Sequence, residues 1–323
     1  MRFFGLVWLA LLTGGGLARA QPEVVRALPP EVRALPPQNG SYRYVTRHFQ
    51  HHSPEALPIR HLEHLAVLAD SIPLLLQAHP LPLYQPSPQQ PGHIQLYANE
   101  DDFVEAGGFK NLAGIYLSLK QRTLLRADLL FPAHRMPASA RLPERHDNLV
   151  LHELIHHSMH GFSGRVPHWF YEGLAEYLVA HHDGGGSFSF GRTEQRLREH
   201  LELYYSTRQP IFSVVPLADL IRWTDQEWND LLAELEPEDR YQPYASALLL
   251  VHYHLSGPSR LAALDSWLKQ LLQPNQNLAP FPMTAAELNV AQERLQDFWR
   301  RRGVTLHFSL PTPPDPRFYR AGE

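Results

Sequence analysis

The sequence contains no cysteine. The absence of thiols excludes disulfides, a cysteine nucleophile, cysteine-ligated metals and iron–sulfur clusters. Lysine is also scarce, and it occurs only as Lys110, Lys120 and Lys269. The formal net charge is −4, so the chain has no basic excess of the kind that binds nucleic acid, and no nucleic-acid partner is expected. Histidine and proline are instead abundant.

Long hydrophobic runs are lacking too, apart from one at the N-terminus. The apolar run over residues 3–18 follows the positive charge of Arg2 and precedes a small-x-small pattern at residues 18–20. These features are typical of a secretory signal peptide over residues 1–20, and the run is short for a bilayer span of about 20 residues. An uncleaved membrane anchor is the alternative. We therefore expect a mature chain that begins near Gln21, lies outside the cytoplasm (periplasmic or secreted) and has no stable membrane insertion.

The composition then changes along the chain and predicts its organisation. Residues 21–40 repeat the sequence Val-Arg-Ala-Leu-Pro-Pro, which predicts an extended proline-rich linker. Strands are expected over residues 42–49, 93–98, 113–119 and 122–129, and a helix is expected to open at Pro58. The apolar side of that helix carries Leu62, Leu65, Leu68 and Ile72. Because strands and helices alternate only loosely over residues 41–185, the sequence predicts an α+β fold with a small mixed sheet covered by helices.

Residues 186–310 predict a mostly helical C-terminal subdomain. Thr224-x-x-Glu227 and Thr284-x-x-Glu287 both match a capping box at a helix start. Prolines at positions 243 and 258 suit first helical turns, and Gly303 suits a helix end. The proline-rich residues 311–323 predict a flexible tail.

One motif predicts chemistry: residues 152–156 read His-Glu-Leu-Ile-His, the pattern H-E-x-x-H. On a helix, His152 and His156 lie on one face about 6 Å apart, so both imidazoles can reach one ion. Glu153 lies about 100° further round, where its carboxylate can take a proton from a water bound to zinc. Apolar neighbours, a cap at Asp147 and glycines at 161 and 164 predict a helix over residues 148–160.

A chain rich in histidine and glutamate can contain this motif by accident, so a third zinc ligand has to be found. His160 lies one turn beyond His156, but three ligands on one straight helix cannot converge on one ion. A second helix, expected from Pro167 to about residue 182, offers Glu172 and Glu176 four residues apart on one face. Exposed carboxylates are the ordinary interpretation, but the apolar surroundings suggest a partner for both. Geometry alone allows either glutamate to bind the metal.

The motif followed by Trp169-Phe-Tyr-Glu172-Gly-Leu-Ala-Glu176 resembles the gluzincin metallopeptidases, in particular their small peptidase-MA-like, or minigluzincin, branch. The resemblance is strong over about residues 145–182 and weaker over 41–130. It implies a zincin-like fold with an active-site helix pair, and one Zn²⁺ per chain held by His152, His156 and Glu172. The spacing of fifteen residues between His156 and Glu172 is shorter than in the large aminopeptidases and thermolysin-like enzymes.

The same resemblance suggests roles for residues around the metal. Glu176 is expected to accept a hydrogen bond from a ligand imidazole, and Gly173 is expected to let the two helices approach closely beside the ion. Gluzincins take an oxyanion donor from the later helices. Tyr244 is the first candidate here, although a buried core tyrosine is an equally ordinary interpretation, and Tyr241 and His252 are its rivals.

Further histidines lie near the motif and in an earlier cluster. His157 and His168 are expected beside the ligands, and His168 is the next candidate for the third ligand. The earlier stretch is interpreted as solvated surface, with an accessory metal site as the alternative; it contains His48, His51, His52, His61 and His64.

The sequence thus predicts a secreted zinc metallopeptidase in which Glu153 is the general base. A peptide or protein substrate is expected to pair with an exposed strand over residues 113–119. One alternative is a non-catalytic binding module of the cell envelope that keeps the zincin fold. Another is a helical scaffold in which the motif is accidental. The intact Glu153 favours the enzyme over the module, and zinc content separates the scaffold from both.

Overall fold

The computed structural model describes residues 22–311 except 111, 132–143, 206, 208, 238, 274–280 and 282. The expected signal peptide and almost all of the expected tail lie outside these residues. In this part of the chain, no helix combines the length and apolar character that a bilayer crossing requires. The described chain is mixed α+β, as the sequence predicts, with a mixed sheet and a mostly helical C-terminal part.

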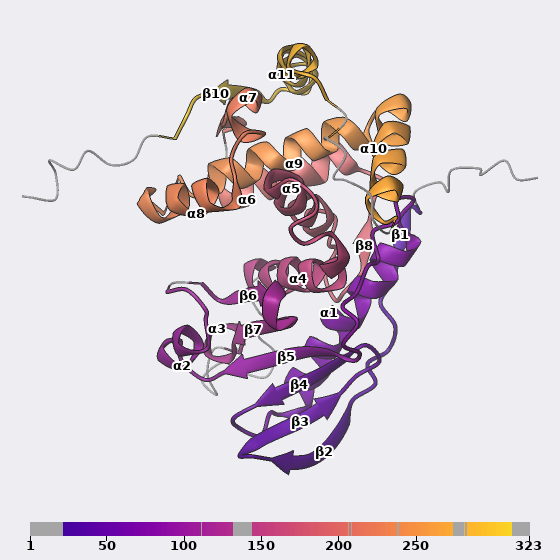
Figure 1. The fold of residues 1–323 in the computed structure, drawn as a ribbon, viewed down its shortest axis with the longest axis vertical. Helices are drawn as coiled ribbons and strands as arrows, with labels where there is room; N and C mark the ends of the chain where they lie inside the picture. The colour runs from indigo at the N-terminus through magenta and orange to yellow at the C-terminus, as the bar shows by residue number, and fades with distance from the viewer. Residues whose placement is uncertain are drawn as a thin grey trace, which may run out of the picture.

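A six-stranded sheet in the order β2-β3-β4-β5-β7-β6 forms the lower part of the molecule (Figure 1). Its strands are β2 (Arg33–Gln38), β3 (Ser41–Val45), β4 (Phe49–Ser53), β5 (Gly92–Tyr97), β6 (Gly114–Leu117) and β7 (Arg122–Arg126). The pairs β4–β5 and β5–β7 are parallel, whereas β2–β3, β3–β4 and β6–β7 are antiparallel. Strand β6 therefore ends the sheet as an edge strand, with β7 as its partner.

The structure places strands inside the segment expected to be a linker. Strand β1 (Val24–Val25) pairs with β8 (Phe188–Ser189), and β2 pairs with β3 through a register shift between Leu35 and Gln38. Prolines 36 and 37 lie at this shift. Because proline lacks an N–H group, it is tolerated at an edge strand or a bulge, and β2 offers both.

The single strand predicted over residues 42–49 is wrong, because the chain turns there and forms β3 and β4. Asp70 of α1 (Ile59–Ala78) holds the residues of this turn by hydrogen bonds. Its carboxylate accepts hydrogen bonds from the Thr46 hydroxyl at 2.9 Å and from the backbone N–H groups of Arg47 and His48 at 3.2 and 3.1 Å. A contact between residues so far apart in the sequence leaves no local pattern.

Helices α1 and α4 (Glu144–Ser158) pack on one another, and α4 also contacts β6 and β7. The four apolar residues predicted for the inner side of α1 are all buried. Short elements complete this half: α2 (Glu100–Glu105), η1 (Ser118–Lys120) and α3 (Ala127–Leu130). The strands predicted over 113–119 and 122–129 are thus shorter than expected, because each runs into one turn of helix.

The C-terminal half is mostly helical. Its helices after η2 (His160–Phe162) are α5 (His168–Val179), α6 (Thr193–Tyr204), α7 (Leu217–Leu220), α8 (Asp225–Glu234), α9 (Tyr241–Leu255), α10 (Pro258–Leu271) and α11 (Ala285–Arg300). Both predicted capping boxes are present, and Gly303 has the left-handed φ of 76° expected after a helix end. A parallel pair of strands, β9 (Ile211–Val214) and β10 (Thr305–Phe308), was not predicted.

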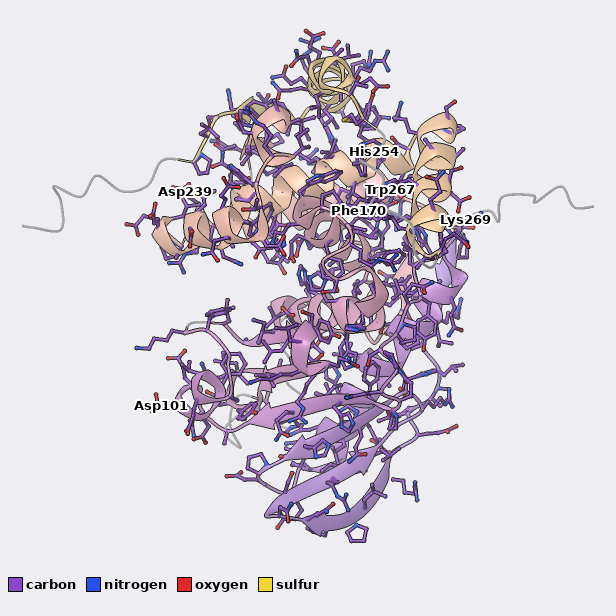
Figure 2. The ribbon with its side chains drawn as sticks, in the orientation of Figure 1. Asp101, Phe170, Asp239, His254, Trp267 and Lys269 are labelled. Atoms are coloured by element: carbon purple, nitrogen blue, oxygen red, sulfur yellow. The ribbon has the colours of Figure 1, made fainter. Side chains whose placement is uncertain are left out.

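Helices α4 and α5 lie between the sheet and the C-terminal helices (Figure 1). Phe170 of α5 packs edge to face against Trp267 of α10, with ring centroids 5.6 Å apart (Figure 2). Helix α5 also packs closely against α9. A Cβ atom added to Gly173 would lie 2.4 Å from the carbonyl oxygen of Ala247 in α9. The expectation that Gly173 faces α4 is therefore wrong, since its bare backbone accommodates α9.

Candidate metal centre

Helix α4 holds the H-E-x-x-H motif, as predicted, but it begins and ends earlier than expected, so that His156 lies in its last turn rather than mid-helix. Asp147 lies inside the helix rather than at its cap, and its carboxylate accepts a hydrogen bond from His64 of α1 at 2.8 Å. Val150, Leu151 and Leu154 are fully buried against the rest of the core. This burial fixes the rotation of α4, so that the two motif histidines face α5.

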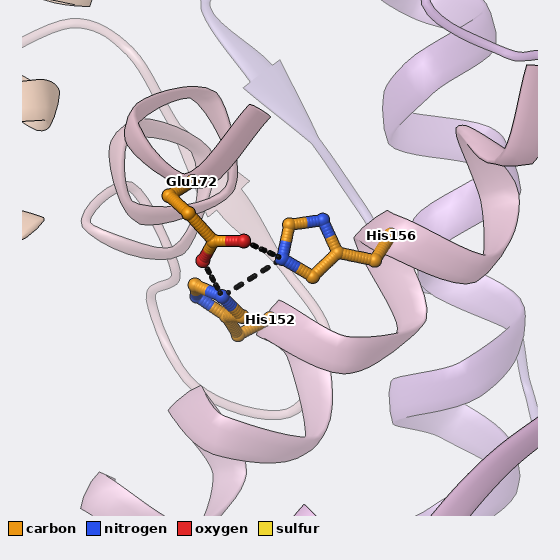
Figure 3. Close-up of side chains that lie close together, drawn as sticks. All are labelled: His152, His156 and Glu172. Carbon is orange, nitrogen blue, oxygen red and sulfur yellow. Dashed lines mark hydrogen bonds and ion pairs between the residues drawn. The ribbon is translucent and has the colours of Figure 1, made fainter. Parts of the chain in front are cut away.

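The side chains of His152, His156 and Glu172 converge on one point (Figure 3). His152 Nε2 lies 3.0 Å from His156 Nε2 and 3.1 Å from Glu172 Oε2, and His156 Nε2 lies 3.3 Å from Glu172 Oε1. A tetrahedral zinc ion with ligands at about 2.0–2.1 Å separates two ligand atoms by about 3.3 Å. The three residues therefore fit a metal ion without rearrangement larger than a few tenths of an ångström.

All three side chains are buried, which makes their charges depend on one another. Burial lowers the pKa of His152, but hydrogen bonds to Glu172 and Glu176 outweigh it and raise that pKa well above its ordinary value. Burial likewise raises the pKa of Glu172, but the charges of His156 and His152 outweigh it and hold that pKa well below its ordinary range. In the metal-free site, a proton on His152 therefore supplies the positive charge beside Glu172 that a bound cation would otherwise supply.

Glu176 does not join the three convergent residues, and it lies one turn further along α5. Its Oε1 accepts a hydrogen bond from His152 Nδ1 at 2.8 Å, as predicted. This bond places the His152 proton on Nδ1 and leaves Nε2 free to bind a metal. Its Oε2 has two further partners, His200 Nε2 at 2.8 Å and the Tyr241 hydroxyl at 2.7 Å.

Glu153 lies next to the convergent residues and faces the edge strand β6. Its Oε2 accepts a hydrogen bond from the backbone N–H of Tyr116 at 2.7 Å. Burial raises the pKa of this carboxyl above its ordinary value, although the positive charges of His152 and His156 oppose the shift. A carboxylate with a raised pKa is a better proton acceptor than an exposed one.

Tyr171 is a residue of the site that the sequence reasoning missed. Its ring stacks on the His156 imidazole with centroids 4.2 Å apart, and its hydroxyl donates to the His156 carbonyl at 2.9 Å. Among the described residues, His156 Nδ1 has no hydrogen-bond partner. Tyr171 therefore orients His156 by stacking. The available signal was its position directly before Glu172, on the helix that faces the motif.

The three candidate oxyanion donors have different surroundings. The Tyr244 ring lies 6.3 Å from the His152 ring, and burial raises the pKa of its phenol. Tyr241 is engaged with Glu176. His252 packs against aromatic rings of α11, with centroids 5.6 Å and 5.9 Å away. Of the three, Tyr244 is the one whose ring adjoins a convergent residue without bonding to Glu176.

The remaining histidines take other positions. His168 Nε2 is 3.9 Å from Glu172 Oε1, and its ring packs against Trp228 of α8. His157 contacts the Thr123 hydroxyl of β7 at 2.9 Å, and His160 contacts the Tyr116 hydroxyl at 2.8 Å. These three residues surround the metal-binding group but do not belong to it.

The interpretation of the earlier histidine stretch as solvated surface is wrong for His51. That side chain is 1% exposed, and burial lowers its pKa to about 3. The reason is the alternation of β4, which turns every second residue into the core. In the described part of the chain, the group at His152 is the sole cluster of three or more potential ligands, so no accessory metal site is found in this stretch.

Comparison of the chain with protein-family profiles, with curated proteins and with solved structures finds no match. The assignment of a function therefore depends on the residues and their geometry.

Proposed function

We propose that the protein is a zinc metallopeptidase of gluzincin type, with a zincin-like catalytic part, that works outside the cytoplasm. The observation that supports this most strongly is the convergence of the ligand atoms of His152, His156 and Glu172 within 4.8 Å, with Glu153 beside them. Two imidazoles and one carboxylate are a donor set typical of catalytic zinc, and they leave a fourth position for water or substrate.

The proposed chemistry assigns one role to each residue. A bound zinc ion supplies a Lewis acid and a water molecule of lowered pKa. With zinc bound, Glu153 would accept the proton of that water and would later deliver it to the leaving amine. Tyr244 donates its phenolic proton in a hydrogen bond to the developing oxyanion.

The edge strand β6 supports a peptide as the substrate. The Ala113 carbonyl accepts from the Arg126 N–H, so the alternation of an antiparallel pair directs the backbone groups of Gly114 and Tyr116 away from β7. The Tyr116 N–H indeed points at Glu153. Because that N–H is already bonded to Glu153, we expect an extended peptide to pair with the other outward backbone groups of this edge, which still places the peptide beside the base.

Zinc analysis and peptide hydrolysis test the proposal together. The purified protein should contain about one zinc per chain and hydrolyse members of a mixed peptide library. Glu153→Gln should retain the zinc and lose nearly all hydrolysis, because an amide cannot accept the proton. Zinc binding without hydrolysis by the parent protein would point to a binding module instead, and absence of zinc binding would contradict the metal site itself.

A further inference from the structure

Glu176 connects helices α6 and α9 to the metal-binding group through hydrogen bonds. Glu176 is 6% exposed, and its carboxylate lies among groups from four elements. Helix α5 carries it, α4 supplies His152, α6 supplies His200 and α9 supplies Tyr241. Oε1 accepts a hydrogen bond from His152, and Oε2 accepts hydrogen bonds from both His200 and Tyr241.

We propose that Tyr241 and His200 are positioning residues that hold Glu176 in the orientation that fixes His152 for metal binding, so that helices α6 and α9 set the metal affinity of a site built on α4 and α5. The inference rests on the proposed zinc site. It assigns Tyr241 a role different from oxyanion donation, and it gives His200 a role that no motif in the sequence indicates.

The geometry of the carboxylate supports this assignment. A glutamate side chain has three rotatable bonds, and its entropy favours many orientations unless both oxygens are bound. The hydrogen bond to His152 alone leaves the second oxygen free to turn. Two donors at 2.7 and 2.8 Å on that oxygen leave one orientation, and donors to an ionised acceptor form the stronger class of hydrogen bonds.

The surroundings hold the two donors themselves in place. The Tyr241 ring stacks on Tyr204 with centroids 4.4 Å apart, and Tyr204 in turn lies 4.7 Å from the His200 ring. Both donors are therefore fixed in one aromatic cluster that joins α6 to α9. Tyr205 belongs to the same cluster, but its hydroxyl donates to the backbone carbonyl of Ser213 and does not reach Glu176.

This difference provides a matched pair of variants. Tyr241→Phe and Tyr205→Phe each remove one hydroxyl from the same cluster, but only the first removes a donor from Glu176. Loss of a partner outside the ligand shell weakens metal affinity or activity by about 10–100-fold. Because Tyr241 acts through Glu176, we expect Tyr241→Phe to weaken zinc affinity by about 10-fold, the low end of that range, and Tyr205→Phe to leave it unchanged.

His200 offers a rescue test. Its Nε2 is separated from Cβ by the same number of bonds as the amide nitrogen of glutamine, so His200→Gln can keep the donor. His200→Leu removes the donor. The leucine side chain also fills the space of the imidazole, so that water from the adjacent cavity of about 220 Å³ does not replace the lost donor. Zinc affinity should fall in His200→Leu and recover in His200→Gln.

The experiment measures zinc affinity by competition with a chromophoric chelator, together with thermal unfolding of each metal-free variant. The expected result is weaker zinc binding in Tyr241→Phe than in Tyr205→Phe at similar metal-free stability. Equal losses of affinity and stability in both variants would show a merely structural role. Unchanged affinity with lost hydrolysis in Tyr241→Phe would make it an oxyanion donor instead. Either outcome overturns the proposal.

A second readout separates this inference from the proposed function. In the metal-free protein labelled with ¹⁵N-histidine, the His152 Nδ1 proton should exchange with solvent faster in Tyr241→Phe than in the parent or in Tyr205→Phe. If the parent binds no zinc, the proposed function fails, and the exchange rates still decide whether Tyr241 fixes Glu176. Equal exchange in all three proteins would contradict the positioning role.

Discussion

Replacement of Gly173 by alanine tests how closely α5 and α9 approach beside the metal-binding group. Alanine in a helix interior is favoured over glycine by about 1 kcal/mol, so an unobstructed site would be stabilised. Here the new Cβ would lie 2.4 Å from the carbonyl oxygen and 2.5 Å from the carbonyl carbon of Ala247, both in the backbone of α9. Backbone atoms inside a helix cannot rotate away as a side chain can. Overpacking of this kind typically destabilises a protein by about 1–3 kcal/mol, which exceeds the gain in helix propensity.

We therefore expect Gly173→Ala to lower the free energy of unfolding by up to about 2 kcal/mol in urea denaturation of the metal-free protein. The shift of α5 should also weaken zinc binding, because Gly173 lies between Glu172 and Glu176. Gly184→Ala serves as the control. It introduces a side chain at a left-handed φ of 85° with no atom within 4 Å, so it should destabilise by about 1 kcal/mol but leave zinc affinity unchanged. A Gly173→Ala protein that is more stable than its parent would refute the close approach of the two helices.

Three further predictions concern other residues. Asp70→Ala should lower the free energy of unfolding by about 2–3 kcal/mol in denaturant titration, because it leaves the donors at residues 46–48 without their acceptor; a change below 0.5 kcal/mol would contradict its role at the β3–β4 turn. The pKa of His152 is raised above 6.5 in the folded protein. At pH values between 6.5 and this folded-state pKa, the metal-free folded protein therefore keeps a proton that the unfolded chain has lost. Its free energy of unfolding should therefore fall, and its zinc affinity rise, as the pH increases above about 6.5, and pH-independent affinity would count against that proton. Tyr244→Phe should lower kcat with little change in zinc affinity, whereas equal kcat in both proteins would exclude Tyr244 as the oxyanion donor.

The predictions that succeeded from sequence rest on local patterns. The helix with His152 and His156, the helix with Glu172 and the capping boxes of α8 and α11 all depend on residues within one or two turns. The contact of Glu176 with His152 was also predicted, from a resemblance carried by one short motif.

The features that were missed depend on contacts between distant residues. The turn between β3 and β4 depends on Asp70, and the packing of Gly173 depends on α9. The bonds of His200 and Tyr241 to Glu176 join residues 24 and 65 positions from it. No periodicity or spacing in the sequence identifies such partners, because either side chain is equally typical of an ordinary buried helix face.

The measurement that tests the central claim most directly is a zinc titration of the parent protein, Glu172→Ala and Glu176→Ala, with bound metal quantified after removal of free ions. Our account predicts about one zinc per chain in the parent, almost none in Glu172→Ala, and retained but weaker binding in Glu176→Ala, since loss of an outer partner weakens affinity about 10–100-fold. A parent protein that binds no zinc would contradict the metal centre. Full binding by Glu172→Ala together with loss in Glu176→Ala would show that Glu176, and not Glu172, is the third ligand.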